Sequence, residues 1–361
     1  MIKALFSKCD KVLILAAVLL TFWGLASIYS TSFYHQDFSD FYKQLAFLGV
    51  GFSLMLAVSF FDYRKLKGNS YFVLIVYFLL LFSLVGLFLM PAIRGAHRWY
   101  PLGPISFDPM PFMALGLIIL LAKFLSQRHA ELHRFQYLLL SGFYAFWPII
   151  LIFFQPNFGG AIVFFLLWFG IILFAGIKPT HLLILLLALA VVGTMVWSFG
   201  LEDYQRQRVV DFLGWQDDPL GASWNINQSR IAIGSGQVWG KGFLAGSQAR
   251  YGFLPEAKTD FIFAAIAEEF GFMGVLGLFS LFGLIVWRLL KICLRTVGNF
   301  GRIYCVGLIV FLVTSVFLNV AMNLGLLPVV GLPLPLVSYG GSYLVAFYLG
   351  LGLALSISRY R

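Results

Sequence analysis

Residues 158–176 read FGGAIVFFLLWFGIILFAG, nineteen consecutive positions without a charged side chain. A helix of about 20 apolar residues is long enough to cross the roughly 30 Å hydrocarbon layer of a membrane. Windows of the same kind recur near residues 11–31, 42–61, 71–91, 109–125, 137–154, 158–176, 180–200, 260–289, 303–327 and 338–358. Because backbone polar groups find no water in lipid, each window is expected to form a helix.

The composition of the whole chain indicates the same class of protein. Of the 361 residues, 61% are hydrophobic, 18% are aromatic and 11% are charged. This balance excludes a water-soluble protein with a polar surface. We therefore predict one all-α polytopic membrane domain over residues 1–361, with about ten transmembrane helices. The long segment 201–259, between the seventh and eighth helices, is predicted to be an extracytoplasmic loop.

Lys and Arg residues are distributed unevenly between the predicted loops. If the N-terminus is cytoplasmic, most of them fall on the cytoplasmic side, and the short outer loops hold only Lys43, Arg94 and Arg98. Basic residues in short loops stay in the cytoplasm, so both termini are predicted to be cytoplasmic. The formal net charge of +10 reflects this bias and does not indicate nucleic-acid binding.

The segment 201–259 is much longer than the 12–15 residues of an ordinary connection, and such loops are usually functional or disordered. Its many aromatic residues favour an ordered loop at the membrane surface. Within it, WNINQSRIAIGSGQVWGKGF (residues 224–243) predicts a short interfacial helix followed by Gly-rich turns. The glycines and Lys241 could bind a phosphate, although turns alone also require Gly. Likewise, Arg206 and Arg208 could grip a diphosphate or could pair with neighbouring acidic residues.

The stretch at residues 252–269, GFLPEAKTDFIFAAIAEE, places several charged residues at the start of an apolar run. A charge inside the hydrocarbon costs roughly 2.5–3.5 kcal/mol, so an ionisable residue there is a candidate for a functional site. Asp260, near Glu256 and Lys258, could accept a proton from a bound hydroxyl group.

Helix capping offers a second interpretation of the same residues. Thr259 would be the N-cap, and Asp260 would lie in the first turn, where the helix dipole stabilises an acid by about 0.3–1 kcal/mol. Glu268 and Glu269 follow about 12–14 Å further along the same helix, given its 1.5 Å rise per residue. Both carboxylates are expected inside the bilayer, where each needs a partner.

Several longer strings resemble one known family. They are DYQRQRV (203–209), GKGFLAGSQ (240–248), FLPEAKTDFIFAAIAEEFGFMG (253–274) and GLLPVVGLPLPLVSYGGS (325–342). They are similar to the SEDS polytopic membrane proteins of bacterial cell-wall synthesis, and nearer to the RodA branch than to the FtsW branch.

The resemblance implies a ten-helix peptidoglycan glycosyltransferase that polymerises lipid II at the outer face of the bacterial inner membrane during elongation. It implies that Asp260 is the essential acid, acting as the base for the acceptor hydroxyl in an inverting displacement. The positions it suggests for binding the substrate and its leaving diphosphate are Arg98, Arg206, Arg208, Lys241, Glu256, Lys258, Thr259, Ser338 and Ser342. No cofactor is required by the resemblance, and a divalent cation, Mg²⁺ or Mn²⁺, is left open. The implied partners are a class B penicillin-binding protein and other elongation-complex membrane proteins.

The N-terminal half departs from the family pattern at several places. The usual G-A-R-R-W reads Gly95-Ala96-His97-Arg98-Trp99, and the usual F-Q-P-S-E reads Phe107-Asp108-Pro109-Met110-Pro111. The Lys three residues later is Ala114, and the acid of Q-P-D-L-G-T is Asn157. Losing both members of a buried ion pair leaves no orphan charge. Two rival functions stay open: a lipid II flippase, and a catalytically weak scaffold for the penicillin-binding protein, which is suggested by the lost Glu and Lys. The intact motif at residues 252–269 argues against the scaffold.

Overall fold

The computed structural model describes residues 10–91, 97–103, 105–128, 135–195, 197–198 and 222–360. Within these residues, nine helices are long and apolar enough to cross a membrane. They are α2 (Lys11–His35), α3 (Ser39–Phe60), α5 (Ser70–Gly86) extended by the 3-10 turn η1 (Leu87–Leu89), α6 (Met110–Gln127), α7 (Phe135–Phe154), α8 (Phe158–Ala175), α13 (Ile262–Arg295), α14 (Asn299–Asn323) and α15 (Gly341–Arg359). The prediction of an all-α polytopic membrane protein is confirmed.

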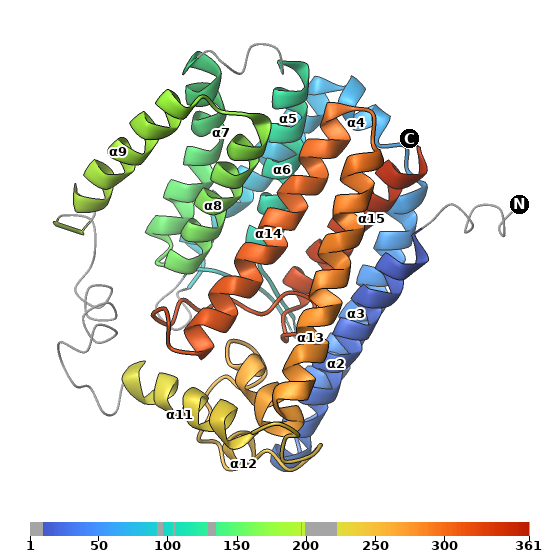
Figure 1. The fold of residues 1–361 in the computed structure, drawn as a ribbon, viewed down its shortest axis with the longest axis vertical. Coiled ribbons are helices and arrows are strands. Elements are labelled where there is room, and N and C mark those ends of the chain that lie inside the picture. Colours follow the sequence, from blue (N-terminus) through green and yellow to red (C-terminus); the bar gives the residue numbers. More distant parts are fainter. Residues whose placement is uncertain are drawn as a thin grey trace, which may run out of the picture.

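The remaining elements are short. The remaining predicted window, 180–200, holds α9 (Pro179–Met195), an apolar helix of 17 residues at the outer edge of the bundle in Figure 1. α4 (Arg64–Gly68) connects two spans, and β1 (Tyr100–Leu102) pairs with β2 (Ile105–Phe107) in an antiparallel hairpin before α6. In the predicted loop, α11 (Ala222–Ser235) precedes the glycine-rich stretch and α12 (Ser247–Arg250), a helix that was not predicted, follows it.

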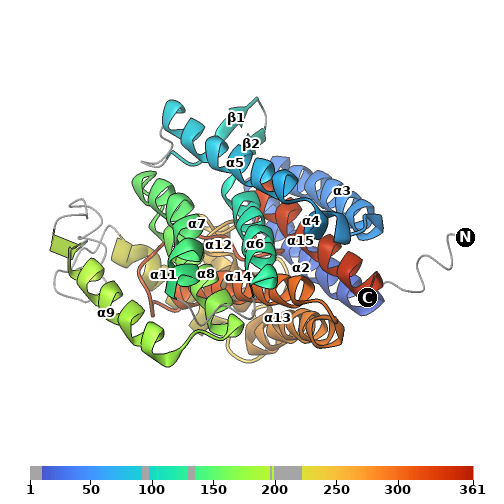
Figure 2. The ribbon, with the colours of Figure 1, turned by 90° about the horizontal axis from the view of Figure 1, so that it is seen from above.

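The bundle is organised around α14. This helix packs against α6, α8 and α13 and runs through the middle of the bundle in Figure 2. α15 packs along α3, where a Cβ added to Gly352 would lie 2.7 Å from the Met55 carbonyl oxygen. Glycine therefore permits the close approach of these two helices.

The span α13 is broken near its start. Gly271 has φ 63° and ψ −165°, and the neighbouring amides of Phe272 and Met273 donate to the carbonyls of Gln237 and Val238 instead of to their own helix. An added Cβ at Gly271 would lie 2.2 Å from the Gly240 nitrogen, so the close approach of the 237–240 backbone requires glycine. Glu268 and Glu269 lie on α13 as expected, and the loop inserts just after them, at Gly271.

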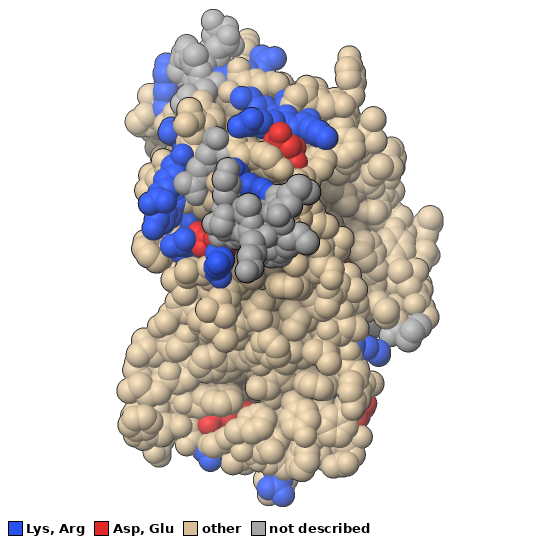
Figure 3. Space-filling view, turned by 90° about the vertical axis from the view of Figure 1, so that its right-hand side faces the viewer, with Lys and Arg blue, Asp and Glu red and all other residues tan. Residues whose placement is uncertain are grey.

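The two ends of the bundle differ in charge. Figure 3 shows Lys and Arg gathered toward one end, above a broad band of uncharged surface. α2 begins and α15 ends at that end, whereas α11 and α12 lie at the opposite end (Figure 1). The candidate site lies toward the α11 and α12 end.

Candidate active site

The segment before α13 holds Asp260 in a turn, not in a helix. The helix begins at Ile262, and the Thr259 hydroxyl donates to the backbone and side-chain oxygens of Glu256. The capping prediction for Thr259 is therefore wrong. Neighbouring loop residues complete the turn: the Tyr339 amide donates to the Lys258 carbonyl at 2.8 Å.

Two asparagines of α14 anchor the Asp260 backbone. Asn319 Nδ2 and Asn323 Nδ2 donate to the Asp260 carbonyl at 3.0 and 2.9 Å, and both side chains are fully buried. Asn323 Oδ1 also accepts from the Ala264 amide at 3.2 Å, which joins the turn to the first part of α13. The turn that carries Asp260 is thus held in place by α14.

Asp260 lines a cavity of about 810 Å³. The walls come from segments far apart in the sequence: the β1–β2 hairpin, the starts of α8 and α15, α11, the turn before α13 and the loop after α14. The lining includes Arg98, Trp99, Asp108, Asn157, Asn225, Glu256, Thr259, Asp260, Gly331, Tyr339, Ser342 and Tyr343. A cavity of this size, with a few convergent polar groups, is typical of a small-molecule site.

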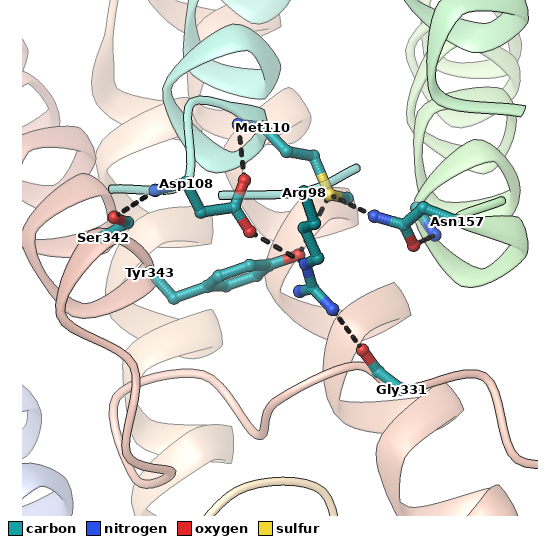
Figure 4. Close-up of polar contacts among 8 residues, drawn as sticks. Arg98, Asp108, Met110, Asn157, Gly331, Ser342 and Tyr343 are labelled. Carbon is teal, nitrogen blue, oxygen red and sulfur yellow. Dashed lines mark hydrogen bonds and ion pairs between the residues drawn. The ribbon is translucent and has the colours of Figure 1, made fainter. Parts of the chain in front are cut away.

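A buried ion pair lies on the wall formed by the hairpin. Arg98 Nε donates to Asp108 Oδ2 at 3.0 Å, and Arg98 Nη1 donates to the Gly331 carbonyl at 2.7 Å. Figure 4 shows the guanidinium between these two partners, with Tyr343 alongside. Asp108 also accepts from the Met110 amide through Oδ1 at 2.9 Å, and its own amide donates to Ser342 Oγ at 2.8 Å.

Burial and charge act on the titration of these groups in opposite directions. Burial raises the pKa of the Asp108 carboxyl, and Arg98 opposes that rise. Burial alone would lower the pKa of Arg98, but Asp108, Tyr343 and Asp260 outweigh it and raise that pKa above its usual value. Burial, together with Asp40, raises the pKa of Tyr339 to about 12. Arg98 is therefore a permanent cation, and the Tyr339 hydroxyl is neutral at physiological pH.

The cavity carries more acidic than basic groups. Among its described lining residues, Asp108, Glu256 and Asp260 are acidic, and Arg98 is the single Lys or Arg. A diphosphate bound here therefore needs Arg98 and further positive charge. Arg206 and Arg208, two of the predicted sources of that charge, lie outside the described residues.

The other predicted binding residues divide into two groups. Ser342, Thr259 and Glu256 line the cavity. Lys241 instead pairs with Glu268 at 2.6 Å, and Lys258 pairs with Asp40 at 3.0 Å; neither lysine lines the cavity.

Ser338 has a supporting position near the turn. Its hydroxyl donates to the Thr259 carbonyl and accepts from the Leu334 amide at 2.8 Å. The serine therefore joins the loop after α14 to the turn that holds Asp260, and it lies outside the cavity lining.

The sequence departures leave no unpaired charge in this region. Pro111 and Ala114 are buried on α6, and Asn157 is the N-cap of α8, accepting from the Gly160 amide at 3.0 Å. An Asn at this position keeps the capping bond that a carboxylate would make. The Asn157 amide nitrogen also contacts the Met110 sulfur at 3.6 Å.

Three contributors to the site are not predicted from the sequence: Asp108 as an ion-pair partner, Asn319 and Asn323. The two asparagines stand four residues apart in an otherwise apolar window, so they share one helix face. That spacing was a usable signal. Nothing in the sequence pairs Asp108 with Arg98, because the hairpin brings them together.

Known proteins resemble the chain over nearly its whole length. A family model for FtsW, RodA and SpoVE, described as cell cycle protein, matches residues 9–361. Peptidoglycan glycosyltransferase MrdB of Escherichia coli (strain K12) is 34% identical over 352 residues, 98% of this chain and 94% of that protein. Stage V sporulation protein E of Bacillus subtilis (strain 168) is 33% identical over 367 residues, 97% of each.

Solved structures give the same relationship. The crystal structure of the rod shape determining protein RodA of Thermus thermophilus superimposes with a TM-score of 0.72 at 30% identity, covering 97% of each chain. A chain of a peptidoglycan synthase complex, described as coordinating polymerization and crosslinking, gives a TM-score of 0.82 at 32% identity, covering 97% of this chain and 98% of that one. On sequence and architecture alike, the chain belongs to the FtsW/RodA/SpoVE family of polytopic membrane proteins, also called SEDS proteins.

Proposed function

We propose that this protein is a peptidoglycan glycosyltransferase that polymerises lipid II during cell elongation, with Asp260 as its general base. One observation carries the assignment: Asp260 lines a cavity opposite a buried arginine, on a turn anchored from α14. The related MrdB is named a peptidoglycan glycosyltransferase, which supports the same activity here.

The chemistry needs one base and one anion-stabilising group. The acceptor 4-hydroxyl attacks the anomeric carbon of the donor, a new C–O bond forms as the bond to the diphosphate breaks, and the configuration inverts. Asp260 takes the hydroxyl proton, and such general-base assistance contributes typically about 10²–10⁴-fold in rate. Arg98 lies where it can stabilise the charge that develops on the departing diphosphate.

A divalent cation would supply further positive charge. Within the described part of the chain, no cluster of three or more His, Cys, Asp or Glu could hold a metal ion. Mg²⁺ is commonly bound by one or two carboxylates together with substrate phosphates, and Glu256 on the cavity wall fits that donor set. When bound, Mg²⁺ or Mn²⁺ would neutralise diphosphate charge. We expect chelation to slow polymerisation and either ion to restore it; equal rates in chelator and in Mg²⁺ would exclude this role.

The proposal includes the location and the partner. The protein spans the bacterial inner membrane with both termini in the cytoplasm, supported by the Lys- and Arg-rich end at which α2 begins and α15 ends (Figures 1 and 3). The cavity then opens on the outer side. A class B penicillin-binding protein is the partner, as supported by the similar chain found in a peptidoglycan synthase complex.

The test is glycan-strand formation from purified lipid II by the protein co-purified with its penicillin-binding protein. Asp260→Asn keeps the size of the side chain and removes the base, so polymer should fall by at least about 10²-fold. The matched control is Asp10→Asn, which breaks the Asp10–Arg288 pair near the start of α2. Full polymerisation by a folded Asp260→Asn protein would overturn the base assignment. No polymer from wild type in an intact complex would favour the scaffold.

A further inference from the structure

We propose that Asp108 is a positioning residue that fixes the Arg98 guanidinium on the cavity wall, in the place where it meets the diphosphate of the donor. This inference rests on the proposed glycosyltransferase function. It assigns a role to a residue that stands where the family pattern described above has Gln.

The guanidinium is held at two nitrogens by two different segments. Asp108, which directly follows β2, accepts from Arg98 Nε at 3.0 Å. The Gly331 carbonyl, in the loop after α14, accepts from Arg98 Nη1 at 2.7 Å. The rings of Trp99 and Tyr343 lie 5.3 and 6.0 Å from the guanidinium carbon. A planar fork held in this way has little freedom to rotate.

Asp108 is held in place by partners other than Arg98. Its Oδ1 accepts from the Met110 amide at the start of α6, and its backbone amide donates to Ser342 Oγ at the start of α15. The Asp108 side chain is 5% exposed and the Arg98 side chain is 12% exposed. The two carboxylate oxygens thus have separate tasks, because Oδ1 joins the carboxylate to α6 and Oδ2 orients the arginine.

Gly331 connects this pair to the proposed base. Its carbonyl accepts from Arg98, and a Cβ added to it would lie 3.7 Å from Asp260 Oδ2. Gly331 therefore lies between Arg98 and Asp260: its carbonyl contacts Arg98, and its Cα faces the Asp260 carboxylate. A displaced Arg98 would change the distance between the leaving group and the base, and a misplacement of 1 Å can cost about 10²-fold in rate.

The same region lacks the charged residues that the family pattern carries on α6. Pro111 and Ala114 occupy those positions and are buried. Arg98 and Asp108, which both line the cavity, form an ion pair on this wall. The positive charge on this wall is therefore oriented from the hairpin and not from α6.

A double-mutant cycle on kcat/KM for lipid II polymerisation tests the inference. The four proteins are wild type, Asp108→Asn, Arg98→Ala and the double variant, each co-purified with the penicillin-binding protein. If Asp108 acts through Arg98, Asp108→Asn lowers kcat/KM by roughly tenfold to a hundredfold, and the double variant is no worse than Arg98→Ala alone. Independent, multiplicative losses would refute a positioning role.

Two further variants separate positioning from folding. Asp10→Asn breaks the Asp10–Arg288 ion pair, which is buried to a similar degree, with Asp10 6% and Arg288 18% exposed, and which lies far from the cavity. This variant should lower the thermal midpoint of unfolding and leave kcat/KM unchanged. Asp108→Glu keeps the charge and moves it outward, so it should retain the fold and lose less activity than Asp108→Asn. If Asp108→Asn does not fold, Asp108→Glu replaces it in the cycle. Absence of polymer from wild type would reject the proposed function, whereas an active wild type with multiplicative losses would reject this inference alone.

Discussion

Replacing Lys241 by Met separates a structural role for this lysine from the substrate-binding role suggested by the glycine-rich sequence. The Lys241 ammonium lies 2.6 Å from Glu268 Oε1, and the Glu268 side chain is fully buried. Glu268 also accepts from the Ser247 hydroxyl at 2.9 Å and from the Gln248 amide at 3.1 Å. Lys241→Met would leave a buried carboxylate without its counter-charge.

The expected loss of stability follows from this geometry. Removing one partner of a buried ion pair costs about 3–5 kcal/mol. The lower end applies, because the Lys241 side chain is 30% exposed and Glu268 keeps its bonds to Ser247 and Gln248. We therefore expect about 3 kcal/mol, roughly a hundredfold in the unfolding equilibrium. Lys241→Met combined with Glu268→Gln should cost about 1 kcal/mol, since no buried charge remains.

The assay is the free energy of unfolding in mixed micelles for both single variants and the double variant, together with lipid II polymerisation by the folded fraction. Lys258→Met is the matched comparison, because its ion pair with Asp40 is more exposed, at 17% and 29%. Such a pair should contribute at most about 1 kcal/mol. A Lys241→Met protein with wild-type stability and a raised KM for lipid II would refute the structural role and restore substrate binding.

Three other substitutions probe the turn and the broken helix. Asn323→Leu removes a donor to the Asp260 carbonyl, so it should cost about 1–3 kcal/mol and lower kcat in the folded protein; an unchanged kcat would show that the anchor is dispensable. Gly331→Ala places a side chain at φ +64°, with its methyl group in ordinary contact, 3.7 Å, with Asp260 Oδ2. We expect about 1–2 kcal/mol of backbone strain and slower polymerisation; a wild-type rate would contradict a role of this backbone in positioning the base. Gly271→Ala meets the Gly240 nitrogen at 2.2 Å, so thermal unfolding should occur well below the wild-type midpoint; an unshifted midpoint would mean that the helix is continuous there.

The sequence determined the class of the protein and the positions of its spans. Hydrophobic length is a local property, and a bilayer accepts an apolar window as a helix whatever its neighbours are. The window 158–176 became α8 for this reason. The segment 252–269 is also recognisable as a candidate site, because charged residues at the start of an apolar run are costly unless they have a function.

The tertiary structure decided which charges meet. Lys241 follows glycines in a pattern typical of phosphate binding, yet the inserted loop at Gly271 turns it toward Glu268. Asp108 looked like a simple departure from a family pattern, and the hairpin pairs it with Arg98. Lys241 and Glu268 are 27 residues apart, and Arg98 and Asp108 are 10 residues apart across a hairpin. No local pattern encodes these pairs, because the inserted loop and the hairpin bring them together.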